Sequence, residues 1–170
     1  CGSGLISALS QLVRIGVIDE SGYIRNAKEL RRMGVPVRIC QRVREDGEAG
    51  ERRILLSGEV LQKPVFLTAS DIRQLQLAKG AIRAGIETLL QKAKIPAKEL
   101  RRIYLTGSFG NSLSAEDVTG IGLLPETEKE KITSVSSCAG MGAAMALLSG
   151  QVQRKMEEDA EKICHVELAG

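Results

Sequence analysis

Three residues at the start of the chain, Gly2, Ser3 and Gly4, form a glycine-containing turn that could bind an anion. They precede an amphipathic stretch that predicts a helix ending near Gly16. A helix N-terminus offers free backbone N–H groups and the positive end of the helix dipole, and both favour phosphate. Turns of this kind are also common without a ligand, so a purely structural role stays open.

A second turn, formed by Gly107, Ser108, Phe109 and Gly110, follows a predicted buried strand over residues 103–106. Ligands of α/β proteins bind outside the carboxyl ends of such strands, and glycine lets the backbone approach them closely. The turn lacks the spacing of a dinucleotide-binding fingerprint, and no Walker-type lysine follows it. Two interpretations therefore stay open, a nucleotide-binding turn and a tight strand-to-helix connection.

A predicted long helix over residues 71–93 carries a lysine within its apolar stripe. At about 100° per residue, Lys79 projects among these apolar side chains, and Gln76 and Arg83 flank it on the same side. Such a lysine either reaches the surface or pairs with a ligand. The three polar side chains together suit the ribose or the phosphates of a nucleotide. The apolar stripe consists of Ile72, Leu75, Ala78, Ile82, Ile86, Leu89 and Ala93.

The four cysteines give no sign of a metal site. They are scattered without a C-x-x-C pair, which argues against zinc or a disulfide framework and favours a reducing cytoplasm. Cys138 lies near a predicted helix start, but no histidine is close in sequence to activate it. Cys164 and His165 are interpreted as part of a terminal strand.

Composition excludes several classes of protein. Aromatic residues make up 2% of the chain and hydrophobic residues 43%, which argues against base-stacking nucleic-acid modules and favours one globular core. The net charge of +3 is spread along the chain and indicates no partner. The apolar run at 139–148 is too short to cross a membrane.

The elements that must position the candidate residues alternate between strands and helices. Strands are predicted over residues 53–56, 65–68, 103–106, 131–135 and 163–168, and helices over 71–93, 139–148, 151–161 and from 114. Thr68 and Asp71 have the spacing of a capping box before the long helix. Residues 20–60 are predicted to be a loop-rich insertion with a hairpin tip at 45–50. This order predicts an α/β fold in which helices flank a mixed sheet.

Several runs of residues resemble the C-terminal domain of the reductive activators of corrinoid proteins. They lie at residues 1–6, 71–86, 104–111, 121–125 and 166–168, and the runs at 71–86 and 104–111 are the most specific. Members of this family join a plant-type [2Fe-2S] ferredoxin module to an ATPase domain of the superfamily of sugar kinases, heat-shock chaperones and actin. The resemblance therefore implies an actin-like, ribonuclease H-like ATPase fold.

The resemblance also implies roles for the candidate residues. Gly107 and Gly110 would belong to the adenosine-binding turn, and Gly2 to Gly4 to a loop beside the phosphates. The helix face with Gln76, Lys79 and Arg83 would lie beside the nucleotide. The implied activity couples hydrolysis of ATP with Mg²⁺ to reduction of cob(II)alamin to cob(I)alamin in a corrinoid protein or a corrinoid methyltransferase component.

The ferredoxin cysteine spacing and the upstream phosphate loop of that family are absent from these residues. Ser136 and Ser137 stand where relatives are expected to carry Gly-Asn. We therefore expect residues 1–170 to be a single C-terminal ATPase-type domain, a fragment with little activity alone. The [2Fe-2S] cluster would lie in another domain.

Two other functions stay open at this stage. The chain could be a non-catalytic interaction or dimerisation domain with an actin-like fold, and a homodimer is compatible with it. It could also activate another low-potential enzyme, such as a 2-hydroxyacyl-CoA dehydratase. Those activators carry cluster-ligating cysteines in the ATPase domain, which the four scattered cysteines do not match.

Overall fold

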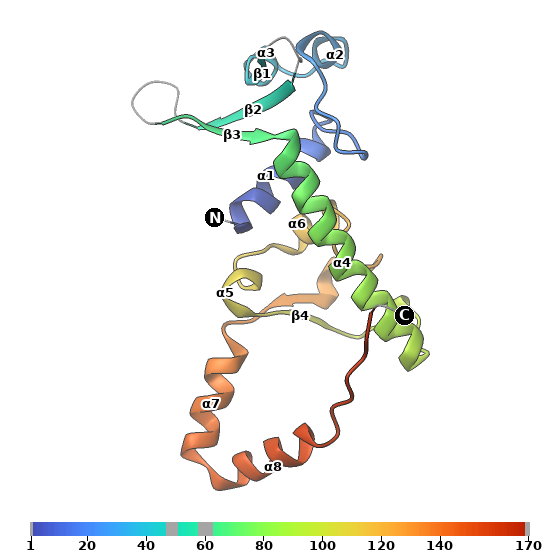
Figure 1. The fold of residues 1–170 in the computed structure, drawn as a ribbon, viewed down its shortest axis with the longest axis vertical. Helices are drawn as coiled ribbons and strands as arrows, with labels where there is room; N and C mark the ends of the chain where they lie inside the picture. The colour runs from blue at the N-terminus through green and yellow to red at the C-terminus, as the bar shows by residue number, and fades with distance from the viewer. Residues whose placement is uncertain (1, 47–50, 58–62, 169–170) are drawn as a thin grey trace.

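The computed structural model describes residues 2–46, 51–57 and 63–168 and arranges them as an elongated α/β fold (Figure 1). In chain order the elements are α1 (Gly2–Arg14), α2 (Ala27–Arg32), α3 (Val37–Cys40), β1 (Val43–Asp46), β2 (Glu51–Ser57), β3 (Val65–Thr68), α4 (Ala69–Ala93), η1 (Ala97–Glu99), β4 (Ile103–Leu105), α5 (Gly107–Gly110), α6 (Ala115–Gly120), η2 (Lys129–Lys131), β5 (Ile132–Ser134), α7 (Cys138–Leu148) and α8 (Gly150–Ala160). Helices α2 and α3 and strands β1 to β3 lie at one end of the molecule, and α7 and α8 lie at the other.

The sheet near the N-terminus is antiparallel with the order β1-β2-β3. Val43 pairs with Ile54, and Ile54 pairs with Leu67, so three buried apolar side chains stand side by side on one face. The strands predicted over 53–56 and 65–68 are confirmed. The predicted hairpin tip at 45–50 falls mostly on residues 47–50, which lie outside the described residues.

The region predicted to be loop-rich, around residues 20–60, contains regular structure. Helix α2 begins after Asn26, whose side chain accepts hydrogen bonds from the N–H groups of Lys28 and Glu29 at 2.9 Å. The Glu29 carboxylate accepts in return from the Asn26 N–H at 2.7 Å. This capping box is visible in the sequence, and the loop prediction missed it.

Helix α4 follows β3 without a loop. The Asp71 N–H donates to Thr68 Oγ1 at 3.1 Å, and the Thr68 N–H donates to Asp71 Oδ2 at 2.9 Å, so the predicted capping box is confirmed. The helix has 25 residues. At 1.5 Å per residue it is about 37 Å long and carries the chain away from the antiparallel sheet.

Strands β4 and β5 form a separate, parallel sheet, in which Tyr104 pairs with Thr133. The prediction of one mixed sheet is therefore wrong for the described residues, which contain an antiparallel sheet and a parallel pair. The physical reason is the length of α4, which separates β3 from β4. The α/β class itself is confirmed.

The predicted terminal strand over residues 163–168 is absent. These residues have no strand partner among the described residues, and Ile163 is 78% exposed. The segment runs back toward α4, where Leu168 Cδ1 lies 3.5 Å from the position of a Cβ on Gly85. Alternating apolar residues alone did not make a strand here because a strand also needs a hydrogen-bonded partner, and these residues pair with none in the described part of the chain.

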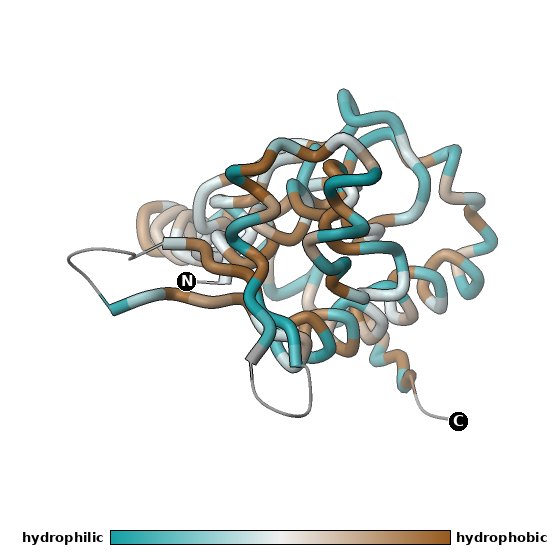
Figure 2. Tube along the Cα trace, turned by 90° about the horizontal axis from the view of Figure 1, so that it is seen from above, coloured by the Kyte–Doolittle hydropathy of each residue, from teal (hydrophilic) through white to brown (hydrophobic). Residues whose placement is uncertain are grey.

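The core gathers where α1 crosses α6 and where the antiparallel sheet meets α2 and α4. Hydrophobic residues also occupy peripheral segments of the trace (Figure 2). Within the described residues, no helix combines the length and apolarity needed to cross a membrane. The most buried large side chains are Val17, Ile18, Leu30, Cys40, Leu67, Ile72 and Val118.

A buried carboxylate joins α1 to α6. Asp117 is 7% exposed, and its Oδ2 accepts a hydrogen bond from Ser7 Oγ at 2.6 Å. The Ser114 side chain caps α6 by accepting from the Asp117 N–H at 3.0 Å. A Cβ on Gly120 would lie 2.6 Å from Ser10 Oγ. The two helices can therefore approach closely because residue 120 is a glycine.

The hydrogen bond from Ser7 is the main reason that the pKa of Asp117 is lowered below its usual value. Burial opposes this effect, and weaker hydrogen bonds from Ser114, Ser10 and Gln11 add to it. The carboxylate is therefore ionised at neutral pH and is held by hydroxyl donors of α1 and of its own helix.

We expect Asp117→Asn to lower the free energy of unfolding by about 1–3 kcal/mol, because it removes charged hydrogen bonds at a buried position. Glu116→Gln is the matched control, since Glu116 is exposed on the same helix and faces Lys129 at 4.0 Å. The control should change stability by less than about 0.5 kcal/mol. Chemical denaturation measures both, and equal effects would contradict the role of Asp117.

The lowered pKa also predicts an acid dependence. The stability that ionised Asp117 contributes is present above the pKa of the unfolded chain, about 3.9, and is lost as the pH falls through the lower folded-state pKa. We expect Asp117→Asn to flatten the unfolding free energy below about pH 4 relative to the unsubstituted protein. Denaturation curves between about pH 2.5 and 6 test this, and an unchanged acid slope would refute it.

Candidate functional site

A pocket of about 320 Å³ opens between α1, α4 and the turn that follows α6. Its size is within the range of small-ligand sites. Two of the side chains predicted to bind a ligand, Gln76 and Lys79, line it together. The other lining residues are Leu9, Val13, Ile18, Asp19, Glu20, Gly22, Ile72, Leu75, Thr119, Gly120, Ile121 and Gly122.

Gln76 fixes one wall of the pocket. Its Nε2 donates to the Ser21 carbonyl oxygen at 2.8 Å, which ties α4 to a turn closed by the bridge between Ile18 and Ile24. Gly22 adopts φ +89°, and a Cβ there would lie 2.5 Å from Gln76 Nε2. Gln76 is therefore a positioning residue of the pocket wall.

Asp19 gives the same wall a negative charge. Its Oδ1 accepts hydrogen bonds from Ser21 Oγ at 2.6 Å, from the Ser21 N–H at 2.9 Å and from the Tyr23 N–H at 3.1 Å. The hydroxyl of Ser21 is the main cause that lowers the pKa of Asp19, against a smaller opposing effect of burial. Asp19 is thus ionised at neutral pH, beside a second carboxyl group, that of Glu20.

Lys79 brings a cation to the pocket. Its side chain is half-buried, and its Nζ lies 4.0 Å from the position of a Cβ on Gly122. No hydrogen bond or ion pair joins Lys79 to another residue in the described part of the chain. A half-buried ammonium group without a protein partner is available to a ligand.

Arg83 does not share this pocket. Its Nη1 donates to the Leu124 carbonyl oxygen at 2.5 Å, and its Nε pairs with Glu87 Oε1 at 2.7 Å. Arg83 lines a second, open hollow with the end of α4 and with Pro125 and Glu126. The structure therefore brings two of the three predicted side chains of α4 together and gives the third a structural contact.

The glycine turn after β4 lies at the carboxyl end of the parallel pair. Gly107 has φ +88°, which disfavours a side chain there, although no protein atom lies within 4 Å of a Cβ on it. The loops after both strands meet at this edge, since Thr106 Oγ1 accepts from the Cys138 N–H at 3.3 Å. The Val135 N–H also donates to the Leu105 carbonyl oxygen at 2.8 Å. Helix α7 begins at the same edge.

Gly107 to Gly110 form one helical turn, α5, rather than an irregular turn. Gly110 has a packing role, because a Cβ there would lie 3.3 Å from the carbonyl carbon of Leu105. The side chains of Ser108 and Phe109 fall outside the described part of the structure. Neither Gly107 nor Gly110 lines the pocket beside Lys79.

Gly2, Ser3 and Gly4 are the first turn of α1 rather than a turn before it, so the predicted helix begins earlier than expected. Helix α1 contacts α5 as well as α6, and its residues Leu9 and Val13 line the pocket. It is therefore the element that joins the glycine turn of α5 to the pocket. The helix ends at Arg14, close to the predicted stop at Gly16.

The three cysteines that the structure describes form no disulfide. Cys40 is buried, and Cys138 and Cys164 are exposed. Across residues 2–46, 51–57 and 63–168, no three His, Cys, Asp or Glu side chains group closely enough to hold a metal ion. The predicted strand role of Cys164 and His165 is wrong, as described above for residues 163–168.

The sequence reasoning missed the acidic side of the pocket and the buried Asp117. The order Asp19, Ser21 and Gly22 is typical of a turn in which an aspartate accepts from the backbone two residues later, so Asp19 could have been found. For Asp117 the signal is weak, because the N3 position of a capped helix is often an exposed acid. Its burial depends on α1, about 110 residues earlier in the chain.

Comparison with known proteins identifies the class of this domain. Residues 1–170 match the family model described as the C-terminal domain of RACo, the ASKHA domain. The chain is 31% identical over 176 residues to the corrinoid activation enzyme RamQ of Eubacterium limosum, with 99% of this chain covered. It spans 28% of the length of that relative.

The fold is therefore that of an ASKHA, or actin-like, domain. The chain belongs to the family of RACo C-terminal domains, which confirms the resemblance to the corrinoid activators.

Gly22 provides a test of the pocket wall. We expect Gly22→Ala to destabilise the protein by more than Gly34→Ala, because both glycines have positive φ but only Gly22 faces Gln76. The strain of a left-handed alanine costs about 1–2 kcal/mol at each site. Denaturation of both variants measures the difference, and equal losses would show that Gln76 moves away without cost.

Proposed function

We propose that this domain forms part of the ATP site of a reductive activator of corrinoid proteins. The supporting observation is the pocket lined by Asp19, Glu20 and Lys79, in which the ammonium group of Lys79 has no protein partner among the described residues. Membership in the family of RACo C-terminal domains supports the same function. The printed name of RamQ, a corrinoid activation enzyme, supports a corrinoid protein as the partner.

The chemistry of the pocket suits the nucleoside end of ATP. Ionised Asp19 can accept hydrogen bonds from ribose hydroxyls, and so can the side chain of Glu20, whereas a carboxylate would repel phosphate. Lys79 can donate to the ribose or to the nearest phosphate oxygen and balances the two carboxylates. Gln76 keeps the acidic turn against α4 through the Ser21 carbonyl.

The glycine turn would serve the same nucleotide from the other side of α1. Gly107 and Gly110 lie at the carboxyl ends of β4 and β5, and the first turn of α1 lies on a helix that contacts α5. When bound, ATP with Mg²⁺ would supply the free energy of hydrolysis. The domain's own residues would bind and orient the nucleotide.

The remaining parts of the function lie outside these residues. We propose that a [2Fe-2S] cluster in another domain supplies the electron that converts cob(II)alamin to cob(I)alamin, in a cytoplasmic protein. Residues 1–170 would act as a single C-terminal domain of that protein.

Lys79→Met tests the proposed nucleotide contact. In the full-length protein we expect it to weaken ATP binding at least about 10-fold, the range of a lost charged hydrogen bond. Stability should change by only about 1 kcal/mol because methionine keeps the packing of the stem. Isothermal titration measures binding, and Lys92→Met, on an exposed part of α4, is the matched control. Unchanged binding in Lys79→Met would refute the contact.

Two substitutions of Gly107 distinguish a role in backbone conformation from a role in nucleotide binding. Asparagine tolerates positive φ much better than valine, so Gly107→Asn should restore stability relative to Gly107→Val. If the nucleotide approaches this backbone, we expect both variants to lose ATP binding. Binding retained in the asparagine variant would show that Gly107 serves only the fold.

A further inference from the structure

Helix α7 has no polar face. Its eleven residues are all apolar or small, and none of them is buried. Leu147 and Leu148 are 88% and 87% exposed, and Met141 and Met145 are 51% and 53% exposed. A helix that is apolar all round is normally surrounded by protein.

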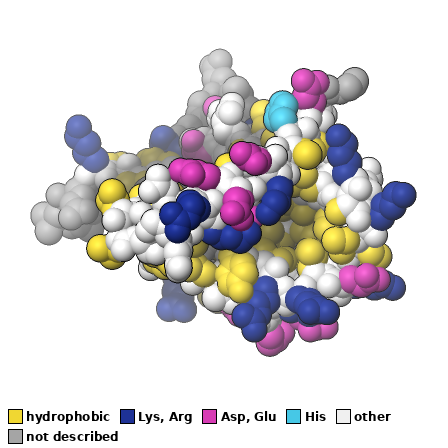
Figure 3. Space-filling view, turned by 90° about the horizontal axis from the view of Figure 1, so that it is seen from below, with side chains coloured by type: hydrophobic (Ala, Val, Ile, Leu, Met, Phe, Trp, Pro, Cys, Tyr) yellow, Lys and Arg dark blue, Asp and Glu magenta, His cyan; other side chains and the backbone are white. Residues whose placement is uncertain are grey.

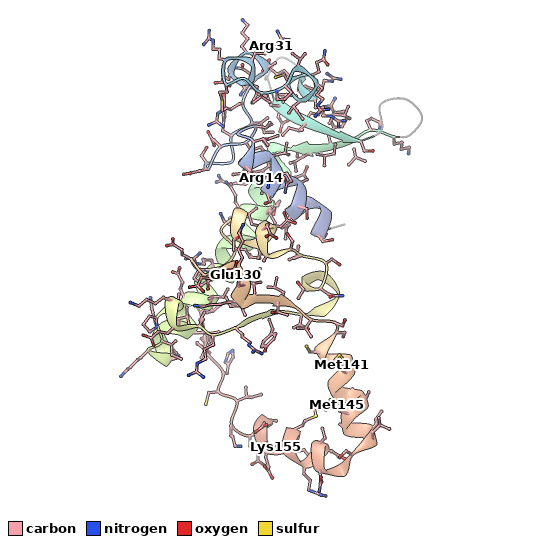
Figure 4. All side chains as sticks on the ribbon, turned by 180° about the vertical axis from the view of Figure 1, so that it is seen from behind. Arg14, Arg31, Glu130, Met141, Met145 and Lys155 are labelled. Atoms are coloured by element: carbon pink, nitrogen blue, oxygen red, sulfur yellow. The ribbon has the colours of Figure 1, made fainter. Side chains whose placement is uncertain are left out.

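Within the described residues, helix α7 packs mainly against α8, where a Cβ on Gly142 would lie 3.3 Å from Met156 Cε. Figure 3 looks at the molecule from the α7 and α8 end and shows hydrophobic side chains gathered on that face. Met141 and Met145 are labelled on α7 in Figure 4, at the end of the molecule far from Arg31.

The elements next to α7 also leave apolar surface uncovered. Parallel sheets are normally covered on both faces and rarely have only two strands, yet β4 and β5 have no third strand among the residues that the structure describes. On α4, Ile82 and Leu89 of the predicted apolar stripe are 49% and 53% exposed, and only Ile72 is buried. The uncovered apolar surface thus extends over α7, the parallel pair and the second half of α4.

The exposed area of the whole chain bears on what covers this surface. The chain exposes 11951 Å², whereas a compact protein of 18.3 kDa exposes about 8,100 Å². The excess of about 3,800 Å² is larger than the roughly 1,000–2,500 Å² that each subunit buries in a large obligate dimer. A second copy of the chain would therefore leave much of it uncovered.

We propose that α7, the β4–β5 pair and the second half of α4 are interior surface, covered by the part of the same polypeptide that lies outside residues 1–170. The relative RamQ has room for such a part, since this chain spans 28% of its length. The inference depends on apolar surface alone and is independent of nucleotide binding.

Oxidation of methionines in the full-length protein tests the proposal. From the exposures given above, Met141 and Met145 should react with hydrogen peroxide at nearly the rate of free methionine if α7 stays uncovered. We expect both to react at least about 10-fold more slowly than free methionine added as a rate standard. Met33, 51% exposed at the opposite end of the molecule, shows whether protection is local.

The measurement is repeated over a series of protein concentrations with the oligomeric state recorded by light scattering. Protection that is the same in the monomer at every dilution supports the proposal. Protection that disappears as a dimer dissociates would assign the surface to a second copy and overturn it. Rapid oxidation in every state would leave the surface open to another partner and would also overturn it.

Substitutions provide a second measurement. Leu147→Lys with Leu148→Lys should lower the Tm of the full-length protein by about 5 °C or more, because two buried charges would enter the interface. Gln151→Lys, on the exposed start of α8, is the control and should shift the Tm by no more than about 1 °C. An equally small shift for the leucine variant would contradict the proposal.

Discussion

The crossing of α1 and α6 depends on the carboxylate of Asp117, and both candidate regions of the site depend on that crossing. Ser7 donates to Asp117 at 2.6 Å, and Gly120 leaves the space that Ser10 needs. A buried charge must be hydrogen-bonded, so the hydroxyls of α1 and the acid of α6 fix one another. Because α1 contacts α5 and lines the pocket, its position sets the geometry of both.

The pocket combines opposite charges on separate elements. Asp19 and Glu20 come from the turn after α1, whereas Lys79 comes from α4. Gln76 joins the two by a single hydrogen bond to Ser21. The charges of the pocket therefore come together through the packing of the turn against α4 rather than from one sequence motif.

The sequence predicts the local elements well because their signals are local. Thr68 with Asp71 and Ser114 with Asp117 mark helix starts that the structure contains. The strand at 163–168 and the single mixed sheet were wrong because strand pairing depends on partners far away in the chain. Lys79 could be identified from helical spacing and Asp19 from its turn, but their place in one pocket could not, because it depends on the turn at 19–22 packing against α4.

Helix α4 is capped at its N-terminus and exposes apolar side chains along its second half. The capping box fixes its first turn to β3, and Gln76 and Lys79 lie about two to three turns further on. Beyond them, Arg83 donates a hydrogen bond to the Leu124 carbonyl oxygen. A rigid rod of about 37 Å that tilts by about 10° at its capped end moves its far end by about 6 Å. Because α4 is one continuous helix, any change in its tilt at the capped end would displace Ala93 further than Lys79.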